Sequence, residues 1–338
     1  MDPALIRQLA LGAFPPLVLG FIIFAAMWWS RRNDLAQAAE LSTGRASVSC
    51  DMGSCSALAR SPYSKLRELL VLLGLAGSFL VLYPLIYGQI QAFPGRSADG
   101  ALFYSTIIAL FVCMLCIFVR CPFRRSVIIA LAAAGIAFLT FRRNIMGLSG
   151  AATWPIGRSA FILALVPTLS VSLSLALSIL ANRGRLGGII SIVACVGAIA
   201  QTLVVTLANL KHAQGAGILA SFLLPAALIV FLRPAMRLPA SAMCFCSLVL
   251  AILLTQAVQF GDADHQRTNW FIIGIVALAP WAAVAVLANM KRGGFSREVL
   301  AIIACSIVGG ACVGYGAYQT LKSQDNKSSG EDYDPYGG

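Results

Sequence analysis

The chain has 338 residues, of which 59% are hydrophobic and only 11% are charged. A water-soluble domain averages about 25% charged residues, so a chain this apolar cannot cover itself with polar side chains and needs lipid around it. The formal net charge of +12 would suit a nucleic-acid-binding protein, but the placement of the charges gives it another meaning.

Ten long stretches of the sequence contain no Asp, Glu, Lys or Arg. A bilayer core needs roughly 17–25 helical residues, and nine of the ten stretches reach that length. Their apolar residues run continuously, which is typical of membrane helices and not of strands with alternating faces. The predicted spans, in chain order, cover residues 8–30, 69–95, 100–119, 126–141, 159–182, 186–210, 212–232, 238–261, 268–290 and 299–321.

These stretches predict an all-α, polytopic bundle of about ten spans in a single domain over residues 1–321, with an inner loop at 31–66. The weak point is the fourth stretch, 126–141, which has 16 residues. If it only dips into the membrane, the chain has nine spans and everything after it is inverted. The polar tail at 322–338 has no apolar period, so we expect it to be disordered.

The basic residues predict the orientation, because cytoplasmic loops collect Lys and Arg. The loops after the odd-numbered spans carry 16 of the 25 basic residues. We therefore expect that face in the cytoplasm, both termini outside, and the inner (cytoplasmic) membrane of a bacterium as the location. The basic excess then reads as an orientation signal with attraction to anionic lipid, and no nucleic-acid partner is expected.

The ten cysteines avoid the predicted outer loops. This distribution is typical of reduced thiols without a disulfide framework. Cys50 and Cys55 repeat the spacing of Cys116 and Cys121 at the same predicted face, and four thiolates could bind zinc. The spacing is not the usual short pair, so we expect inert thiols and no metal or other cofactor.

No Asp, Glu, Lys or Arg lies inside a predicted span. Intramembrane ionisable groups mark proton relays, so their lack argues against a transporter driven through a carboxylate at the midplane. No nucleotide-binding or hydrolase motif is present, and an enzymatic role is not favoured.

Uncharged polar residues within the spans form the first candidate site. Ser170, Ser174 and Ser178 fall on one helix face at four-residue spacing. With Gln201 and Gln256 they could line a path for substrate between helices. The alternative is plain interhelical hydrogen bonding, worth about 0.6 kcal/mol each.

Two further features carry hypotheses. Arg142, Arg143 and Arg158 lie on the face that usually avoids basic charge, where they could bind an anionic headgroup or simply snorkel to the interface. Ser306, Gly310 and Gly314 form a seam of small residues, which could pack within the monomer or against another chain.

Taken together, these features favour a permease-like or carrier-like protein for a small neutral or lipidic substrate. A non-catalytic subunit or scaffold of a membrane complex is the first alternative, with a membrane-protein partner or a homo-oligomer. A membrane-embedded transferase acting on lipid-linked substrates is the second, with Asp262, Asp264 and His265 beside the three arginines as its polar groups. In every case the lipid bilayer is a partner.

Overall fold

The computed structural model describes residues 13–27, 62–87, 90, 98–119, 121–146, 154–182, 210–232, 239–260, 266–289 and 295–328. Most of the predicted inner loop lies outside these residues, as do nearly all of the predicted span at 186–210 and the loop at 261–265. All regular structure in the described part is helical, which confirms the all-α part of the predicted fold class there.

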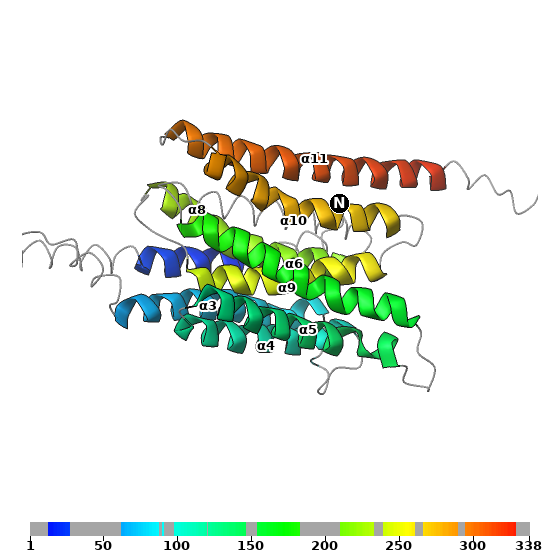
Figure 1. Cartoon of the computed structure of the whole chain (residues 1–338), viewed down its shortest axis with the longest axis horizontal. Helices are drawn as coiled ribbons and strands as arrows, with labels where there is room; N and C mark the ends of the chain where they lie inside the picture. The colour runs from blue at the N-terminus through cyan, green and yellow to red at the C-terminus, as the bar shows by residue number, and fades with distance from the viewer. Residues whose placement is uncertain are drawn as a thin grey trace, which may run out of the picture.

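The described part contains a helix at Ala13–Met27 followed by eight more, arranged as a bundle (Figure 1). The eight are α3 (Pro62–Tyr87), α4 (Ala98–Phe118), α5 (Pro122–Met146), α6 (Ile156–Asn182), α8 (Leu210–Leu232), α9 (Ala240–Phe260), α10 (Gln266–Asn289) and α11 (Phe295–Ser328). Four of them, α3 to α6, are long and apolar enough to cross a membrane. The described part of the chain is therefore compatible with a membrane protein.

Helix α5 covers the stretch that looked too short in the sequence. It has 25 residues, or about 38 Å of helix, against a bilayer core of about 30 Å. The extra length comes from the arginine pairs at its two ends, which the count of uncharged residues left out. Long arginine side chains can lie along a helix while their charged heads reach the membrane surface, so they extend a span without breaking it.

Two other helices run past their predicted limits. Helix α3 starts at Pro62, inside the expected inner loop, since proline fits the first turn of a helix. Helix α11 continues to Ser328, beyond residue 321 where we expected a disordered tail to begin. Adding a residue to an existing helix is much easier than starting one, so the helix continues into polar sequence.

Helices α3 and α4 run antiparallel. The Lys65 ammonium lies 5.1 Å from the centre of the Phe118 ring, which joins the start of α3 to the end of α4. At the other end of the same pair, the rings of Tyr83 and Phe103 are 5.1 Å apart.

Two polar contacts define the ends of the bundle. At one end, Ser241 at the start of α9 donates a hydrogen bond to Glu68 at the start of α3, over 3.4 Å. At the opposite end, Arg158 at the start of α6 donates to Gln259 at the end of α9. We refer to these as the Glu68 end and the Arg158 end.

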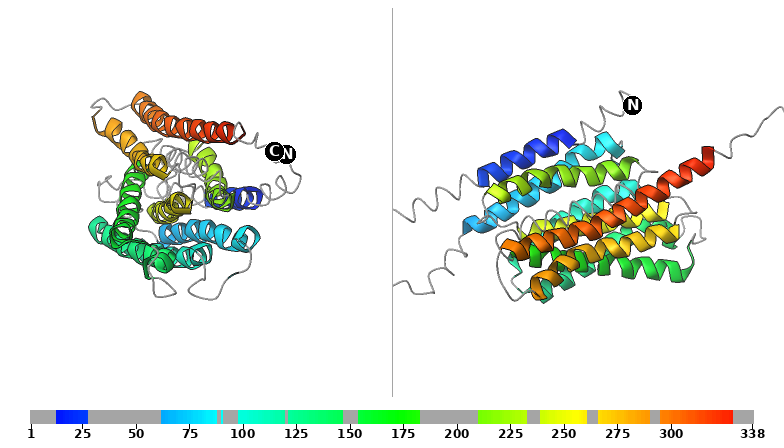
Figure 2. Two further views of the ribbon diagram at one scale, coloured as in Figure 1. Left: turned by 90° about the vertical axis from the view of Figure 1, so that its right-hand side faces the viewer. Right: turned by 90° about the horizontal axis from the view of Figure 1, so that it is seen from above.

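Helix α9 is the central helix of the bundle. It packs against α3, α4, α5, α6, α8 and α10, and Figure 2 shows it enclosed by neighbours. Every side chain from Ser241 to Gln256 is buried. Small residues such as Ala242, Cys244 and Ala251 let the surrounding helices approach it closely.

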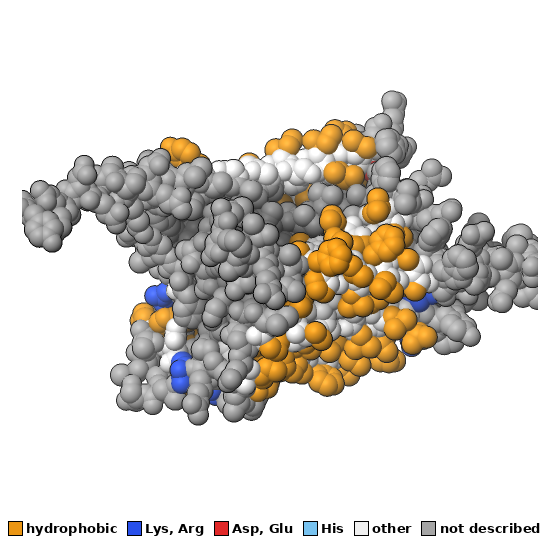
Figure 3. Space-filling view, turned by 180° about the vertical axis from the view of Figure 1, so that it is seen from behind, with side chains coloured by type: hydrophobic (Ala, Val, Ile, Leu, Met, Phe, Trp, Pro, Cys, Tyr) orange, Lys and Arg blue, Asp and Glu red, His pale blue; other side chains and the backbone are white. Residues whose placement is uncertain are grey.

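The outer surface of the bundle has the distribution that a bilayer requires. On the face seen in Figure 3, hydrophobic side chains cover the middle, and the Lys and Arg side chains of the described part lie toward its two ends. The large hydrophobic side chains exposed on the described part include Phe111, Leu115 and Leu131. Water would not tolerate so continuous an apolar surface, but hydrocarbon does.

Close packing of the Ala13–Met27 helix, α3 and α8 depends on two glycines. A Cβ on Gly20 would collide with the backbone carbonyl oxygen of Phe222, and its distance to the Phe222 Cα would be 3.3 Å. A Cβ on Gly74 would meet Ile23 and the Phe222 ring. The glycines therefore allow three helices to cross at short distance.

Helix α11 lies at the edge of the bundle. Among the described elements it packs only against α10. Ser306, Gly310 and Gly314, the predicted seam, belong to this helix, and nothing lies within 4 Å of where a Cβ on either glycine would be. Gly74 thus packs against other helices of the chain, whereas Gly310 and Gly314 in α11 meet no described neighbour.

Candidate functional site

Six hydroxyl side chains in the described part of the bundle, five of them buried, donate to a carbonyl of their own helix. A serine or threonine in a helix can donate to the carbonyl four residues earlier, which removes the need for any other partner. Ser78, Ser105, Thr106, Thr168, Ser247 and Thr255 all do so, over 2.7–2.8 Å.

Ser170 and Ser174, on the predicted substrate face of α6, behave differently. The Oγ of Ser174 lies 3.1 Å from the Sγ of Cys244 on α9. Ser170 is completely buried, and its Oγ has no hydrogen-bond partner in the described part of the chain. Pro167, one turn earlier, lacks an N–H and so cannot bond the Leu163 carbonyl of its own helix.

An unpaired buried hydroxyl costs about 1–3 kcal/mol. A protein can retain such a hydroxyl at a position where a ligand supplies the missing hydrogen bond for part of the time. The Ser170 hydroxyl is therefore the strongest candidate on α6 for contact with a passing polar group.

Contacts along α6 and α9 establish their antiparallel register. Arg158 meets Gln259 near one end and Ser174 meets Cys244 further along. The 12 residues from Cys244 to Gln256 correspond to about 18 Å of helix axis. Gln256, which is fully buried, therefore lies at a different depth from Ser174.

The predicted substrate-binding residues thus occupy separate levels. Ser170 and Ser174 are about one turn apart, Ser178 is half-buried one turn nearer the Glu68 end, and Gln256 belongs to the Arg158 end. Gln201 lies outside the described residues. Polar groups recur along the α6–α9 pair from end to end, separated on α9 by the apolar stretch Leu248–Leu254.

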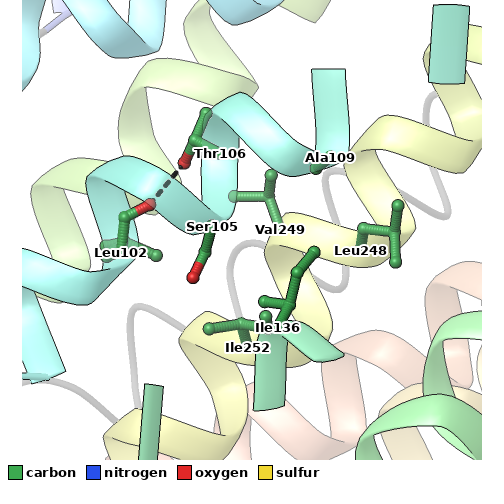
Figure 4. Close-up of a pocket in the computed structure, with 8 residues that line it drawn as sticks. All are labelled: Leu102, Ser105, Thr106, Ala109, Ile136, Leu248, Val249 and Ile252. Carbon is green, nitrogen blue, oxygen red and sulfur yellow. Dashed lines mark hydrogen bonds between the residues drawn. The ribbon is translucent and has the colours of Figure 1, made fainter. Parts of the chain in front are cut away.

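A small hollow lies beside this pair, between α4, α5 and α9. Its lining combines apolar side chains with two hydroxyl residues, Ser105 and Thr106 (Figure 4). Thr106 turns back to the Leu102 carbonyl, whereas the Ser105 and Thr140 hydroxyls lie 3.2 Å apart. The hollow leaves no room for a water molecule, so these helices are in close contact here.

At the Arg158 end, an aromatic pair holds the junction of α5 and α6. The Trp154 ring packs on Phe141 with centres 5.5 Å apart, and the Trp154 backbone N–H donates to the Asn144 carbonyl over 3.1 Å. The Arg158 guanidinium lies over the Trp154 ring, 4.9 Å from its centre. Such a contact contributes about 0.5–2 kcal/mol.

The three predicted headgroup arginines differ in their surroundings. Arg158 is half-buried between Trp154 and Gln259. Arg142 is also half-buried, at the end of α5, whereas Arg143 is exposed. All three belong to the same end of the bundle, but the described contacts hold Arg158 most firmly.

No protein-family model matches the chain. No curated protein sequence is detectably similar to it. The case for function therefore rests on the residues themselves.

Sequence reasoning missed one charged group. Glu68 lies just before the predicted span at 69–95, and in the structure it is half-buried in the second turn of α3. It accepts a hydrogen bond from Ser241 and lies within electrostatic reach of Arg125 and Lys65. Arg125 also donates to the Val119 carbonyl over 3.0 Å. The sequence feature that could have pointed to Glu68 is its position directly before an apolar stretch.

The thiols near this end come together from two helices. Cys113 and Cys116 on α4 lie within electrostatic reach of Cys244 on α9. None of the six cysteines whose side chains the structure describes forms a disulfide. Cys50 and Cys55 lie outside the described residues.

Proposed function

We propose that the chain is a carrier-like or permease-like membrane protein for a small neutral or lipidic substrate, with the α6–α9 pair as its substrate path. The observation that carries the proposal is the buried Ser170 hydroxyl, which has no hydrogen-bond partner among the described residues. Substrate hydroxyl or carbonyl groups could bind there as they pass from one end of the pair to the other.

The helix contacts support a mechanism of small helix movements. The Ser174–Cys244 contact involves a thiol, which is a weak hydrogen-bonding group and exchanges partners readily. Pro167 removes one backbone hydrogen bond from α6 close to Ser170, and such positions are where helices bend. A slight bend of α6 away from α9 would expose Ser170 and Ser174 together.

We also propose that the chain crosses the membrane ten times, with both termini outside and the Glu68 end in the cytoplasm of a bacterial inner membrane. Helix α5 is long enough to cross, which favours ten spans over nine. The basic residues near the Glu68 end, such as Lys65, Arg124 and Arg125, agree with this orientation.

Site-directed labelling tests this topology. Single cysteines at positions 97, 184, 263 and 293 in a cysteine-free background would be treated with a membrane-impermeant thiol reagent in intact cells. We expect labelling at 97 and 263, and at 184 and 293 only after the cells are opened. Labelling at 184 but not at 263 in intact cells would contradict ten spans and support nine.

Transport can be measured with the purified chain in lipid vesicles. Glycerol and urea entry, followed by light scattering, tests small neutral substrates, and flipping of a fluorescent phospholipid tests lipidic ones. We expect the wild-type chain to accelerate at least one of these processes over empty vesicles. Ser170→Leu places a bulky side chain in the path, so we expect at least a tenfold lower rate.

Thr168→Leu is the matched control, because Thr168 is an exposed hydroxyl two residues away that bonds its own helix. We expect it to transport like the wild type. Ser170→Ala removes the hydroxyl with little change in packing. A reduced transport rate in this variant would show that the hydroxyl itself is needed, since alanine does not block the path as leucine does. The carrier proposal fails if no probe moves faster than in empty vesicles, or if the Ser170 and Thr168 variants behave alike.

A second function has one observation in its favour. Glycine in a helix interior costs about 1 kcal/mol relative to alanine, and Gly310 and Gly314 meet no described neighbour that would require them. A role as a subunit or scaffold would explain this cost, because the seam would then admit a helix of another chain.

A further inference from the structure

The first turn of α6 and the end of α9 bring together hydrogen-bond donors that lack an acceptor in the described part of the chain. Arg158 contacts the Trp154 ring and Gln259, and both of these described partners are uncharged. The guanidinium has five N–H donors, so one hydrogen bond leaves most of them available. A half-buried cation with uncharged partners favours an anion beside it.

Two neighbouring groups strengthen this preference. Ser159 is 8% exposed, and its Oγ has no hydrogen-bond partner in the described part of the chain. The usual acceptor, the Pro155 carbonyl, already receives the backbone N–H groups of Arg158 and Ser159, over 3.0 and 3.1 Å. Both lone pairs of that oxygen are therefore occupied, and the Ser159 hydroxyl must find its partner elsewhere.

Gln259 contributes the third donor. Because Arg158 can only donate, the amide oxygen of Gln259 must face it, and this determines the orientation of the amide group. The other atom, Nε2, is buried and has no partner among the described residues. The amide nitrogen can only donate, so an acceptor is what it lacks.

The surroundings suit a phosphate group at a membrane surface. The N-terminus of α6 carries a partial positive charge, and its first backbone N–H groups have no partner within the helix. Arg142, half-buried at the end of α5, adds positive charge at the same end. Exposed apolar side chains on both sides, Met146 and Ile156, could contact the hydrocarbon chains of a lipid.

We propose that Arg158, Ser159 and Gln259 form a binding site for the phosphate group of an amphiphile at the Arg158 end of the bundle. The guanidinium contacts two phosphate oxygens, and the Ser159 hydroxyl and the Gln259 amide donate to the others. Trp154 positions the guanidinium and closes the site toward α5. The site does not depend on transport, so its test is separate from that of the carrier function.

The experiment measures lipid binding to the full chain in a mild detergent by native mass spectrometry. Phosphatidylglycerol is the probe, with zwitterionic phosphatidylcholine for comparison. We expect Arg158→Gln to weaken phosphatidylglycerol binding at least about tenfold. Arg143→Gln is the matched control, because it removes an exposed arginine at the same end, and we expect less than about a twofold change.

Two further variants guard against a folding artefact. Arg158→Lys keeps the positive charge but cannot form the bidentate hydrogen bonds of arginine, so we expect an affinity for phosphatidylglycerol between those of the wild type and Arg158→Gln. Ser159→Ala removes one hydroxyl from a buried position and should weaken phosphatidylglycerol binding about threefold to tenfold without loss of folded protein. Added inorganic phosphate distinguishes the two sources of the ligand, since competition at millimolar concentration indicates a free anion and no competition indicates a lipid headgroup.

The proposal is overturned if Arg158→Gln and Ser159→Ala both bind phosphatidylglycerol like the wild type. It is also overturned if Arg143→Gln weakens binding as much as Arg158→Gln, because diffuse surface charge would then explain the effect.

Discussion

Replacing Gly20 by leucine should destabilise the bundle by about 3 kcal/mol or more, the upper end of what overpacking usually costs. The side chain would have to enter the space now filled by the backbone of α8 at Phe222. A neighbouring side chain can change its rotamer, but a helix backbone can only move as a whole. The measurement is the free energy of unfolding in mixed micelles titrated with a denaturing detergent.

Gly310→Leu is the control for this substitution, because it makes the same change on another helix with open space beside it. We expect the monomer to be as stable as the wild type or slightly more stable, since leucine favours helix more than glycine does. If α11 binds another chain, this variant should instead change the oligomeric mass. Equal destabilisation by both substitutions would contradict the packing of the Ala13–Met27 helix against α8.

Phe245→Ala on the central helix should lower the free energy of unfolding by about 3 kcal/mol. Phe245 is 0% exposed, surrounded by the other helices of the bundle. In a membrane the hydrophobic transfer term is small, because lipid surrounds the side chain when the helices separate. The cost comes instead from the dispersion attraction between the ring and its neighbours, which an empty cavity cannot supply. The expected loss of unfolding free energy therefore lies at the low end of the range for a Phe→Ala substitution.

The matched control is Phe111→Ala on α4, where the ring is 61% exposed on the outer surface. Lipid can fill the space left by that ring, so we expect a change below about 0.5 kcal/mol. A similar loss of stability in the two variants would mean that α9 is not the centre of the bundle.

The charged groups at the two ends of the bundle have different consequences for function. At the Glu68 end, the Glu68 carboxylate lies within electrostatic reach of two basic side chains, Arg125 and Lys65. At the Arg158 end, the described contacts of the arginine are uncharged. This difference is the reason that we place the proposed phosphate site at the Arg158 end.

The amino-acid sequence determined which segments become helices in lipid. A long uncharged apolar stretch has to satisfy its own backbone hydrogen bonds, and that requirement depends only on local composition and length. The described helices follow these stretches, and α5 and α11 extend into polar sequence. Helix α3 starts before its predicted span at 69–95, at Pro62, and ends earlier, at Tyr87. The charged ends were predictable for the same reason, since a charge prefers the membrane surface.

Only the tertiary structure decided which face of each helix lies inward. Gly74 and Gly310 look equivalent in sequence, yet one packs against Phe222 and the other meets no described neighbour. Ser170 and Thr168 are two residues apart, yet one is buried without a partner in the described part of the chain and the other is exposed. In water, polar residues mark the outside of a helix, but lipid is as apolar as a protein interior, so hydrophobicity gives no such signal here. The inward face is decided by helices that are distant in sequence, and that information is present only in their packing.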